Sequence, residues 1–397
     1  MNRRSFIKRS SLASGYFLIP GFLKPLENLS LSVSQKKLVV IQLSGGNDWL
    51  NTIVPFKNDV YYQKRPKLAL KEDMLLPLEK ELAFNRSLIQ LKDFYDNGEV
   101  AIINNVGYPN PDRSHFRSMD IWQSASSSNE YLNTGWLGRY LDNECKNSYQ
   151  AIEVNKYLSL ALKGQKLNGL AVQNLSQLYS EVKTPFFNDL VSSIKENVLN
   201  EDNQGYLYKT LINTTSSVEY LFEKNTPKAI GVNKTDYPNN EFGKQLKNIA
   251  SFIAADTDTR VYYISLSGFD THVGQLSKHH KLLRDYAEGV SVFIQNLKEL
   301  NKWDDTLIFT FSEFGRRVAE NASQGTDHGT AGNVLLFGKN MKKKGIINEL
   351  PDLNNLDEGD LKFTIDFRSI YKNILQNWLQ ADANKIIPAN VQSFEVV

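Results

Sequence analysis

The sequence predicts an α/β fold built around a mostly parallel sheet. Five short apolar runs have the length of buried strands, at residues 37–43, 100–106, 260–267, 306–311 and 333–337. The first run shows no alternation of polar and apolar residues, which is typical of a central strand buried on both faces. Between the third and fourth runs, apolar residues at helical spacing extend from Leu282 to Leu297. This strand–helix–strand order predicts a right-handed crossover that joins parallel strands.

Shorter patterns predict the remaining elements. Residues 88–94 carry apolar side chains at helical spacing, and the Asn-Gly pair at 97–98 would end that helix. Residues 363–379 begin as an extended segment and then become helical. From about 150 to 250 the chain is rich in Asn, Lys, Glu and Ser, with apolar residues at helical intervals. We expect this region to be a mainly helical insertion or a cap over one end of the sheet.

Length and composition are those of an ordinary globular protein. Of the 397 residues, 41% are hydrophobic and 23% are charged, which is enough apolar material for a large core. We therefore expect residues 35–397 to form a single domain. The formal net charge of +2 gives no electrostatic reason to expect a nucleic acid or anionic lipid as a partner. With Cys145 as its single cysteine, the chain has no internal disulfide.

Residues 1–34 predict a twin-arginine signal peptide. The segment Asn2–Lys8 has two arginines, a polar residue, Phe, an aliphatic residue and Lys, in the order of the twin-arginine pattern. The apolar stretch from Leu12 to Leu23 is too short for a membrane span, which needs about 20 apolar residues. We expect export by the twin-arginine machinery, a periplasmic or other exported location, and no stable membrane span once the signal is removed. The alternative is a basic tail before a surface helix.

Polar segments that contain carboxylates and histidines follow several predicted strands. In an open α/β sheet, the loops beyond the carboxyl ends of the strands converge on one crevice. The candidate site residues in these segments are Asn47, Asp48, Arg113, Ser114, His115, Asp270, His272, Glu313, Arg316, Asp327 and His328. Carboxylates and imidazoles gathered at one place suit a divalent metal ion or general acid–base chemistry.

The segment after the third strand is a candidate for metal ligands. Asp270 and His272 are two residues apart in a glycine-led loop, so both can face one centre, and a carboxylate with an imidazole suits zinc, manganese or iron. The same pair could instead be a carboxylate that orients a general-base histidine. Asp270 could also cap the next helix. His279 and His280, in the first turn of that helix, are expected to face solvent.

Two later segments add a carboxylate and a histidine. Glu313 follows the fourth strand. Arg316 or Arg317 would either pair with it or hold an anionic substrate, because guanidinium binds phosphate, sulfate or carboxylate in a bidentate manner. Glycines surround Asp327 and His328 so closely that we expect another group to approach the backbone there. His328 is the strongest histidine candidate, and an ordinary turn is the alternative.

Two earlier segments give further candidates. Ser114 beside His115 suggests a nucleophile and a base, but adjacent side chains diverge, which favours Arg113 or His115 as a substrate contact or ligand. The glycine turn after the first strand lacks the spacing of a dinucleotide or phosphate loop. There Asp48 would be a ligand or a cap, and Asn47 a substrate contact.

Six motifs in order along the chain resemble those of one bacterial family. They are Leu43–Asp48 with Leu50–Thr52, Arg113–Phe116, Gly135–Arg139, Phe269–His272, Ser312–Arg316 and Thr326–Gly329. Together with the twin-arginine leader, they resemble the family known as domain of unknown function 1501, over nearly the whole mature chain. That family is grouped with the alkaline-phosphatase-like clan of phosphatases, sulfatases and phosphoglycerate mutases.

The resemblance implies a fold and a chemistry. The fold would be a three-layer α/β sandwich with two metal ions at the strand ends, where a metal-activated nucleophile attacks phosphorus or sulfur. By the resemblance, Asp270 and His272 would lie in one metal segment. His328 would be the late histidine ligand, and Glu313 the strand-end carboxylate.

The sequence departs from the clan pattern at three places. Ser44 stands where an aspartate commonly follows the first strand, and Ser312-Glu313-Phe314 replaces the usual Asp-His pair. Pro111 and Asp112 lie near the nucleophile position ahead of His115, where the clan has a Ser, Thr or Cys. One metal ion, or none, is therefore an alternative to two.

The leading hypothesis is an exported, metal-dependent hydrolase of phosphate or sulfate esters. Zinc, manganese or calcium would be held by residues from Asp270, His272, Glu313, His328, Asp48 and Asp327. Catalytic groups would be Ser114 and His115, and an anionic ester, either a small molecule or a glycan, would be bound by Arg113, Arg316 and Asn47. The missing nucleophile motivates the alternative, a non-catalytic periplasmic binding or assembly protein on the same scaffold.

Overall fold

The computed structural model describes residues 36–193, 203–225 and 235–397. The predicted twin-arginine signal, residues 1–34, lies outside the described residues. All positions and contacts given below refer to the described part of the chain.

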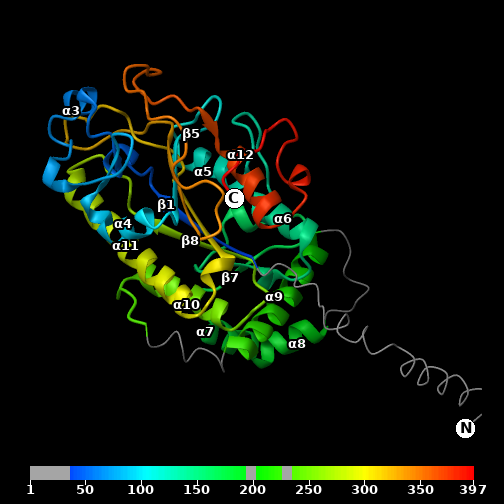
Figure 1. The fold of residues 1–397 in the computed structure, drawn as a ribbon. Coiled ribbons are helices and arrows are strands. Elements are labelled where there is room, and N and C mark those ends of the chain that lie inside the picture. Colours follow the sequence, from blue (N-terminus) through cyan, green and yellow to red (C-terminus); the bar gives the residue numbers. More distant parts are fainter. Residues whose placement is uncertain (1–35, 194–202, 226–234) are drawn as a thin grey trace, which may run out of the picture. The chain divides into compact units, whose positions relative to one another are not determined.

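A nine-stranded, mostly parallel sheet forms the centre of the fold (Figure 1). The central strand β1 (Lys37–Ser44) pairs in parallel with β8 (Val261–Ser267) and with β9 (Thr306–Phe311). On the far side of β9 lies β10 (Gly332–Phe337), which runs antiparallel to both β9 and β5 (Val100–Gly107). Because β10 is reversed, its beginning lies at the same sheet edge as the carboxyl ends of β1, β5, β8 and β9.

Short strands complete this sheet and a small second one. The strand order is β11-β5-β10-β9-β1-β8-β6-β7, with β12 also paired to β5. The short members of the main sheet are β6 (Ala151–Glu153), β7 (Leu170–Ala171), β11 (Gly345–Ile346) and β12 (Ile365–Asp366). The small antiparallel sheet consists of β2 (Ile53–Val54), β4 (Ala83–Asn85) and β3 (Leu75–Pro77).

Helices cover both faces of the main sheet (Figure 1). One face carries α4 (Ile89–Asp96), α10 (Glu241–Ala254) and α11 (Gln275–Glu299). The other face carries α5 (His115–Ser124), α6 (Trp136–Glu144) and α12 (Phe367–Asn373). Val39 and Ile41 of β1 belong to the first core, and Leu38 and Val40 to the second. The central strand is thus buried on both sides, and the predicted three-layer α/β sandwich is confirmed.

The remaining described helices lie in the connections. A short helix, α3 (Asp59–Lys64), lies between β2 and β3 of the small sheet. Between β7 and β8 the chain forms α7 (Leu175–Val182), α8 (Pro185–Ser193), α9 (Asn203–Asn225) and then α10. The rings of Tyr179 and Phe222 stack with centroids 3.8 Å apart, which joins α7 to α9. Within the described residues, no helix combines the length and the apolar character that crossing a membrane requires.

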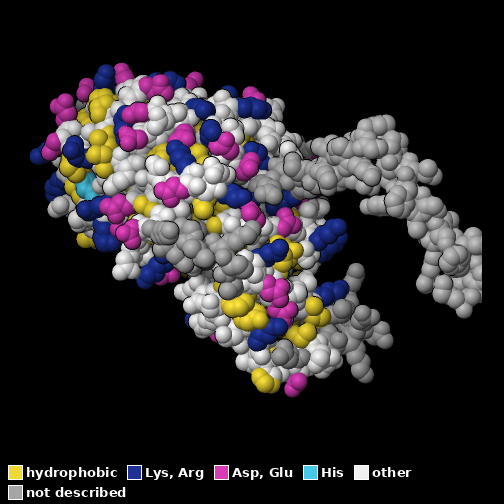
Figure 2. Space-filling model, turned by 60° about the horizontal axis from the view of Figure 1, so that its bottom comes forward, with side chains coloured by type: hydrophobic (Ala, Val, Ile, Leu, Met, Phe, Trp, Pro, Cys, Tyr) yellow, Lys and Arg dark blue, Asp and Glu magenta, His cyan; other side chains and the backbone are white. Residues whose placement is uncertain are grey.

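Surface charge is mixed over the face drawn in Figure 2. Lys and Arg side chains are interspersed with Asp and Glu side chains across the described residues of that face. This pattern agrees with the small formal net charge of +2. Mixed charge of this kind produces no strong field of one sign.

Candidate functional site

The candidate site lies at the edge of the sheet where the parallel strands end. Asp270 and His272 follow β8, and Glu313 follows β9. His115 is the first residue of α5, which follows β5, and His328 lies in the loop that leads into β10. Four segments that are distant in sequence therefore meet at one edge, because β5, β8 and β9 share a direction and β10 is reversed.

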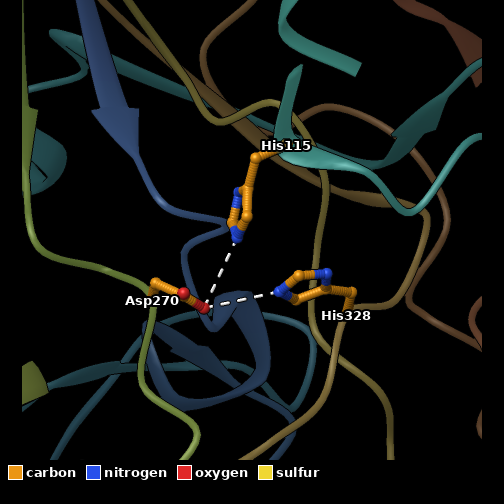
Figure 3. Close-up of side chains that lie close together, drawn as sticks. All are labelled: His115, Asp270 and His328. Atoms are coloured by element: carbon orange, nitrogen blue, oxygen red, sulfur yellow. Dashed lines mark hydrogen bonds and ion pairs between the residues drawn. The ribbon is translucent and has the colours of Figure 1, made fainter. Parts of the chain in front are cut away.

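Three imidazoles converge on the carboxylate of Asp270, and Figure 3 shows two of them, His115 and His328. The distance from Asp270 Oδ1 is 3.4 Å to His115 Nε2, 3.0 Å to His272 Nε2 and 3.4 Å to His328 Nε2. The Nε2 atoms of His272 and His328 are 3.0 Å apart. The Asp270 side chain is 49% exposed, so the cluster opens to solvent on one side.

Each of these imidazoles is held from behind through its Nδ1 atom. The partners are Glu313 Oε1 at 3.0 Å for His115, Asp327 Oδ1 at 3.2 Å for His272, and the Arg113 carbonyl oxygen at 2.7 Å for His328. Donation from each Nδ1–H leaves the Nε2 lone pair directed at the centre. Histidines that bind metal ions in proteins are oriented in this way by carboxylates and carbonyl groups.

The residues present fit a divalent metal ion. A tetrahedral ion with ligands at 2.0–2.1 Å separates its ligand atoms by about 3.3 Å. Four of the six distances among these atoms, from Asp270 Oδ1 to each Nε2 and between the Nε2 atoms of His272 and His328, lie between 3.0 and 3.4 Å. His115, Asp270 and His328 each offer a ligand atom within 4.8 Å of the others. His115 Nε2 is also buried without a hydrogen-bond partner, an arrangement that a metal ion would satisfy.

Arg316 belongs to the scaffold of the site. Its guanidinium is fully buried, and one nitrogen, Nη2, lies 2.7 Å from Asp270 Oδ1. The remaining donors bond to the carbonyl oxygens of Gly45, Gly46, Phe269 and Thr326. The predicted role of Arg316 as a substrate contact therefore does not match its position, because its donors already tie three loops together.

Electrostatics keep Asp270 charged. Burial alone would raise its pKa, but the hydrogen bond and positive charge of Arg316 outweigh burial and lower the pKa to about 2. The hydrogen bond to Glu313 raises the pKa of His115, whereas burial lowers the pKa of His328. At neutral pH the cluster therefore contains an ionised carboxylate, the form that a metal ligand requires.

Glu313 and Asp327 contact histidines of the cluster on the side away from Asp270. The Glu313 carboxylate is fully buried and accepts hydrogen bonds from the Gly45 backbone N–H at 2.8 Å and from the Ser312 hydroxyl at 3.1 Å. Asp327 Oδ1 accepts from the Asn321 side chain at 3.1 Å. Both were predicted as ligands, and in the structure both instead orient a histidine that faces the centre.

Asp48 and Asn47 lie away from the cluster. Asp48 is buried against Arg65, with Oδ2 2.7 Å from Nη1; burial would raise its pKa, but this guanidinium lowers it.

Asn47 is also buried, and its Oδ1 lies 2.8 Å from His279 Nε2. The prediction that His279 faces solvent is wrong, because the first turn of α11 packs beneath the loop after β1. Burial there lowers the pKa of His279 to about 4.

Ser114 and Arg113 lie at the rim. Ser114 is exposed at the N-cap of α5, and its backbone N–H donates to Asp112 Oδ1 at 2.7 Å. Among the described contacts, none joins the Ser114 hydroxyl to the cluster. The Arg113 side chain is 39% exposed and donates from Nε to Asp360 Oδ2 at 2.8 Å. Arg65 and Asp360, which anchor the surrounding loops, were not predicted, and no local pattern in the sequence marks them.

A family profile described as "Protein of unknown function (DUF1501)" matches residues 99–378. No protein with a curated description matches the chain. Among solved structures, the chain is similar to the PsFucS1 sulfatase from Pseudoalteromonas sp., with 12% identity, a TM-score of 0.38, and coverage of 83% of this chain and 68% of that chain.

Two further solved structures are similar to the chain. The C-terminal periplasmic domain of EcEptC from Escherichia coli matches with 8% identity, a TM-score of 0.33, and coverage of 77% of this chain and 73% of that chain. A protein in the alkaline phosphatase superfamily from Vibrio parahaemolyticus matches with 10% identity, a TM-score of 0.33, and coverage of 80% and 62%. Likenesses this distant carry no argument about activity, so function has to be argued from the side chains.

Proposed function

This chain belongs to the DUF1501 family, and we propose that it binds a divalent metal ion and hydrolyses esters of phosphate or sulfate. The observation that carries the proposal is the convergence of three imidazole Nε2 atoms on Asp270, each imidazole being held from behind. Imidazole nitrogens favour zinc over calcium, which prefers a shell of oxygen ligands. The ligands would be His115, Asp270, His272 and His328.

The chain's own residues prepare the site for this chemistry. When bound, a divalent ion supplies a Lewis acid and a water of lowered pKa. Glu313 keeps the proton of His115 on Nδ1, and the Arg316 guanidinium keeps Asp270 ionised. The exposed side of the cluster leaves room for an ester. Attack by water also agrees with the position of Ser114, whose hydroxyl lies outside the cluster.

The substrate class rests on the chain's motifs and on the rim of the site. The six motifs resemble the DUF1501 family, and the grouping of that family with the alkaline-phosphatase-like clan supports an anionic ester, either a small molecule or a glycan. The half-exposed guanidinium of Arg113 lies two residues before His115 and is suited to contact an anionic oxygen. The pattern at residues 2–8 supports export by the twin-arginine pathway, so we propose that the protein acts in the periplasm or another exported location.

Metal content tests the first half of the proposal. We expect wild-type protein purified without chelator to contain about one metal ion per chain by mass spectrometry. Asp270→Asn and His328→Ala should lose most of it. His280→Ala is the matched control, because His280 lies on α11 outside the cluster. Variants of Asp270 and His328 that retain wild-type metal content would remove the proposed site.

A turnover assay tests whether the protein hydrolyses esters and distinguishes a hydrolase from a non-catalytic binding protein. Wild-type protein loaded with zinc or manganese is incubated with aryl phosphate and aryl sulfate. We expect release of the phenol with at least one of them, and loss of release in His328→Ala. The burial of Arg316, the predicted anion contact, is the observation that favours the alternative. Metal binding without turnover would support a binding or assembly role.

A further inference from the structure

A buried carboxylate outside the histidine cluster pairs with two arginine side chains. Asp360 is 1% exposed, and its Oδ2 accepts hydrogen bonds from Nε of Arg113 at 2.8 Å and from Nη2 of the same residue. Its Oδ1 forms an ion pair with Nε of Arg317 at 3.7 Å, a distance too long for a hydrogen bond. A buried charge is costly unless it is paired, so the carboxylate and the Arg113 guanidinium hold each other in place.

Arg113 connects this carboxylate to a proposed metal ligand. Its side chain donates to Asp360, and its carbonyl oxygen accepts a hydrogen bond from His328 Nδ1 at 2.7 Å. With its Nδ1 occupied in this way, the His328 ring directs Nε2 at Asp270, 3.4 Å from Oδ1. The direction of this ring therefore depends on where the carbonyl oxygen of Arg113 is held.

Local bonds alone hold the residues on either side of Arg113. Asp112 and Ser114 bond to each other, to Tyr108 and to Ser118, all within one stretch of chain. Residues 108–114 form neither helix nor strand, and no hydrogen bond to a described residue uses the backbone N–H of Arg113. The contact with Asp360 is therefore what fixes Arg113, with its carbonyl oxygen, against a distant part of the chain.

The turn that carries Asp360 is closed by its own backbone. The N–H of Asp357 donates to the carbonyl oxygen of Asp360, and the N–H of Asp360 donates to that of Asp357, at 2.9 Å each. The two residues between them have φ of 49° and 90°, the left-handed values of a tight hairpin turn. The next carbonyl oxygen, of Leu361, accepts from the Thr330 hydroxyl at 2.7 Å, which ties the turn to the loop that contains His328. Asp360 therefore stands on a fixed support.

We propose that Asp360 is a positioning residue of the metal site, which acts through Arg113 to keep Nε2 of His328 directed at the ion. This inference rests on the metal-binding half of the proposed function. Without the carbonyl oxygen of Arg113 as acceptor, the His328 ring would turn, or its proton would move to Nε2 and block the ligand position. A carboxylate that contacts neither the ion nor any ligand would thus set the affinity of the site, and groups behind metal ligands contribute about 10–100-fold.

The zinc affinity of folded, metal-free protein tests the inference, measured by competition with a chromophoric chelator. Asp360→Asn and Arg113→Ala should each bind zinc at least about tenfold more weakly than wild type. Loss of the positive charge of Arg113 would by itself favour a nearby cation, so weaker binding in Arg113→Ala reports a displaced ligand and not a change of charge. The Arg113 side chain is 39% exposed, so this variant decides the test if Asp360→Asn does not fold by circular dichroism.

Arg317→Ala is the matched control, because the Arg317 side chain is also 39% exposed and pairs with the same carboxylate. The Arg317 backbone is held independently, by bonds to Asp327 at 3.0 Å and to Arg65 at 2.8 Å. We therefore expect zinc affinity within about twofold of wild type. The double variant Asp360→Asn/Arg113→Ala should lose no more than about twofold beyond Asp360→Asn, because both changes act on one path. Equal falls in Arg113→Ala and Arg317→Ala, or losses that multiply in the double variant, would overturn the proposal.

A measurement without metal keeps the inference separate from the proposed function. Nitrogen NMR of the histidine rings in metal-free protein reports which ring nitrogen carries the proton, and His328→Ala identifies the signal. We expect neutral His328 to carry it on Nδ1 in wild type, and partly on Nε2 in Arg113→Ala and Asp360→Asn. This change in a wild-type protein that binds no zinc would retain the positioning role and reject the metal site. Zinc binding with unchanged affinity and unchanged ring protonation in both variants would reject the positioning role alone.

Discussion

Replacing Asp48 with Asn is expected to destabilise the fold by about 3–5 kcal/mol without removing a metal ligand. The Asp48 carboxylate accepts from Arg65 Nη1 at 2.9 and 2.7 Å and also from the Gln275 side chain. Arg65 is fully buried and donates onward to the carbonyl oxygens of Val318 and Arg317 at 2.8 Å each. Loss of the carboxylate charge would leave this guanidinium buried without a counter-charge.

Two independent routes give the magnitude. At an effective dielectric constant of 20, opposite charges about 4 Å apart attract by about 4 kcal/mol. Removal of one partner from buried ion pairs costs about 3–5 kcal/mol. The amide of Asn would also turn a donor toward the donors of Arg65 or Gln275, so we expect little recovery from new hydrogen bonds.

Urea unfolding followed by circular dichroism measures the effect, and metal content is measured on the same samples. The matched control is Asp96→Asn, which removes an exposed pair with Lys92 and should change the free energy of unfolding by about 0.5 kcal/mol or less. A variant of Asp48 that unfolds within about 1 kcal/mol of wild type would refute the reasoning. Loss of metal without loss of stability would instead restore Asp48 as a ligand.

Three further predictions concern single groups. Burial raises the pKa of Glu153 from 4.5 to about 6, so the folded state binds this proton more tightly than the unfolded state. The free energy of unfolding should therefore fall by about 2 kcal/mol as pH rises from about 4.5 through 6. Urea unfolding of Glu153→Gln at several pH values should lack that fall. The hydrogen bond to Glu313 raises the pKa of His115, so Glu313→Gln should lower it in NMR titrations of metal-free protein, and an unchanged pKa would assign the shift to another group. Gly45 has φ of 116°, and a Cβ there would lie 2.4 Å from a backbone nitrogen of the loop after β8, whereas Gly274, with φ of 54°, has open space around it. Gly274→Ala should therefore lower the free energy of unfolding by about 1–2 kcal/mol, and Gly45→Ala should lower it clearly more, in thermal or urea unfolding. Equal losses would mean that backbone conformation alone explains both.

The layered fold could be predicted because its signals are local. An apolar run without alternation marked β1, and a helical pattern between two such runs marked the β8–α11–β9 unit. The resemblance to the DUF1501 family, read from short motifs, is confirmed by the match over residues 99–378. Strand direction has no such local signal, so the reversal of β10 could not be predicted from the short run at residues 333–337.

The site was predictable in its residue types but not in their roles. Asp270, His272 and His328 meet as expected, because the loops at one sheet edge converge. A shift of about 3 Å, the length of one hydrogen bond, decides whether a carboxylate binds the metal ion itself or orients a histidine that binds it. Glu313 is in the second position. Of two adjacent arginines, the sequence could not indicate that Arg316 would be the one enclosed by backbone carbonyl groups.

The wide separation of the ligands along the chain has a consequence for the order of maturation. Among the proposed ligands, His328 and Asp270 are 58 positions apart, and His115 lies 198 positions from Glu313, the carboxylate that orients it. An ion that meets the unfolded polypeptide finds only one closely spaced pair of donors, two residues apart, so tight capture has to wait until the strands have assembled. If the proposed site is occupied, loading with metal would report that folding is finished, and chelation would loosen several remote stretches of the chain together.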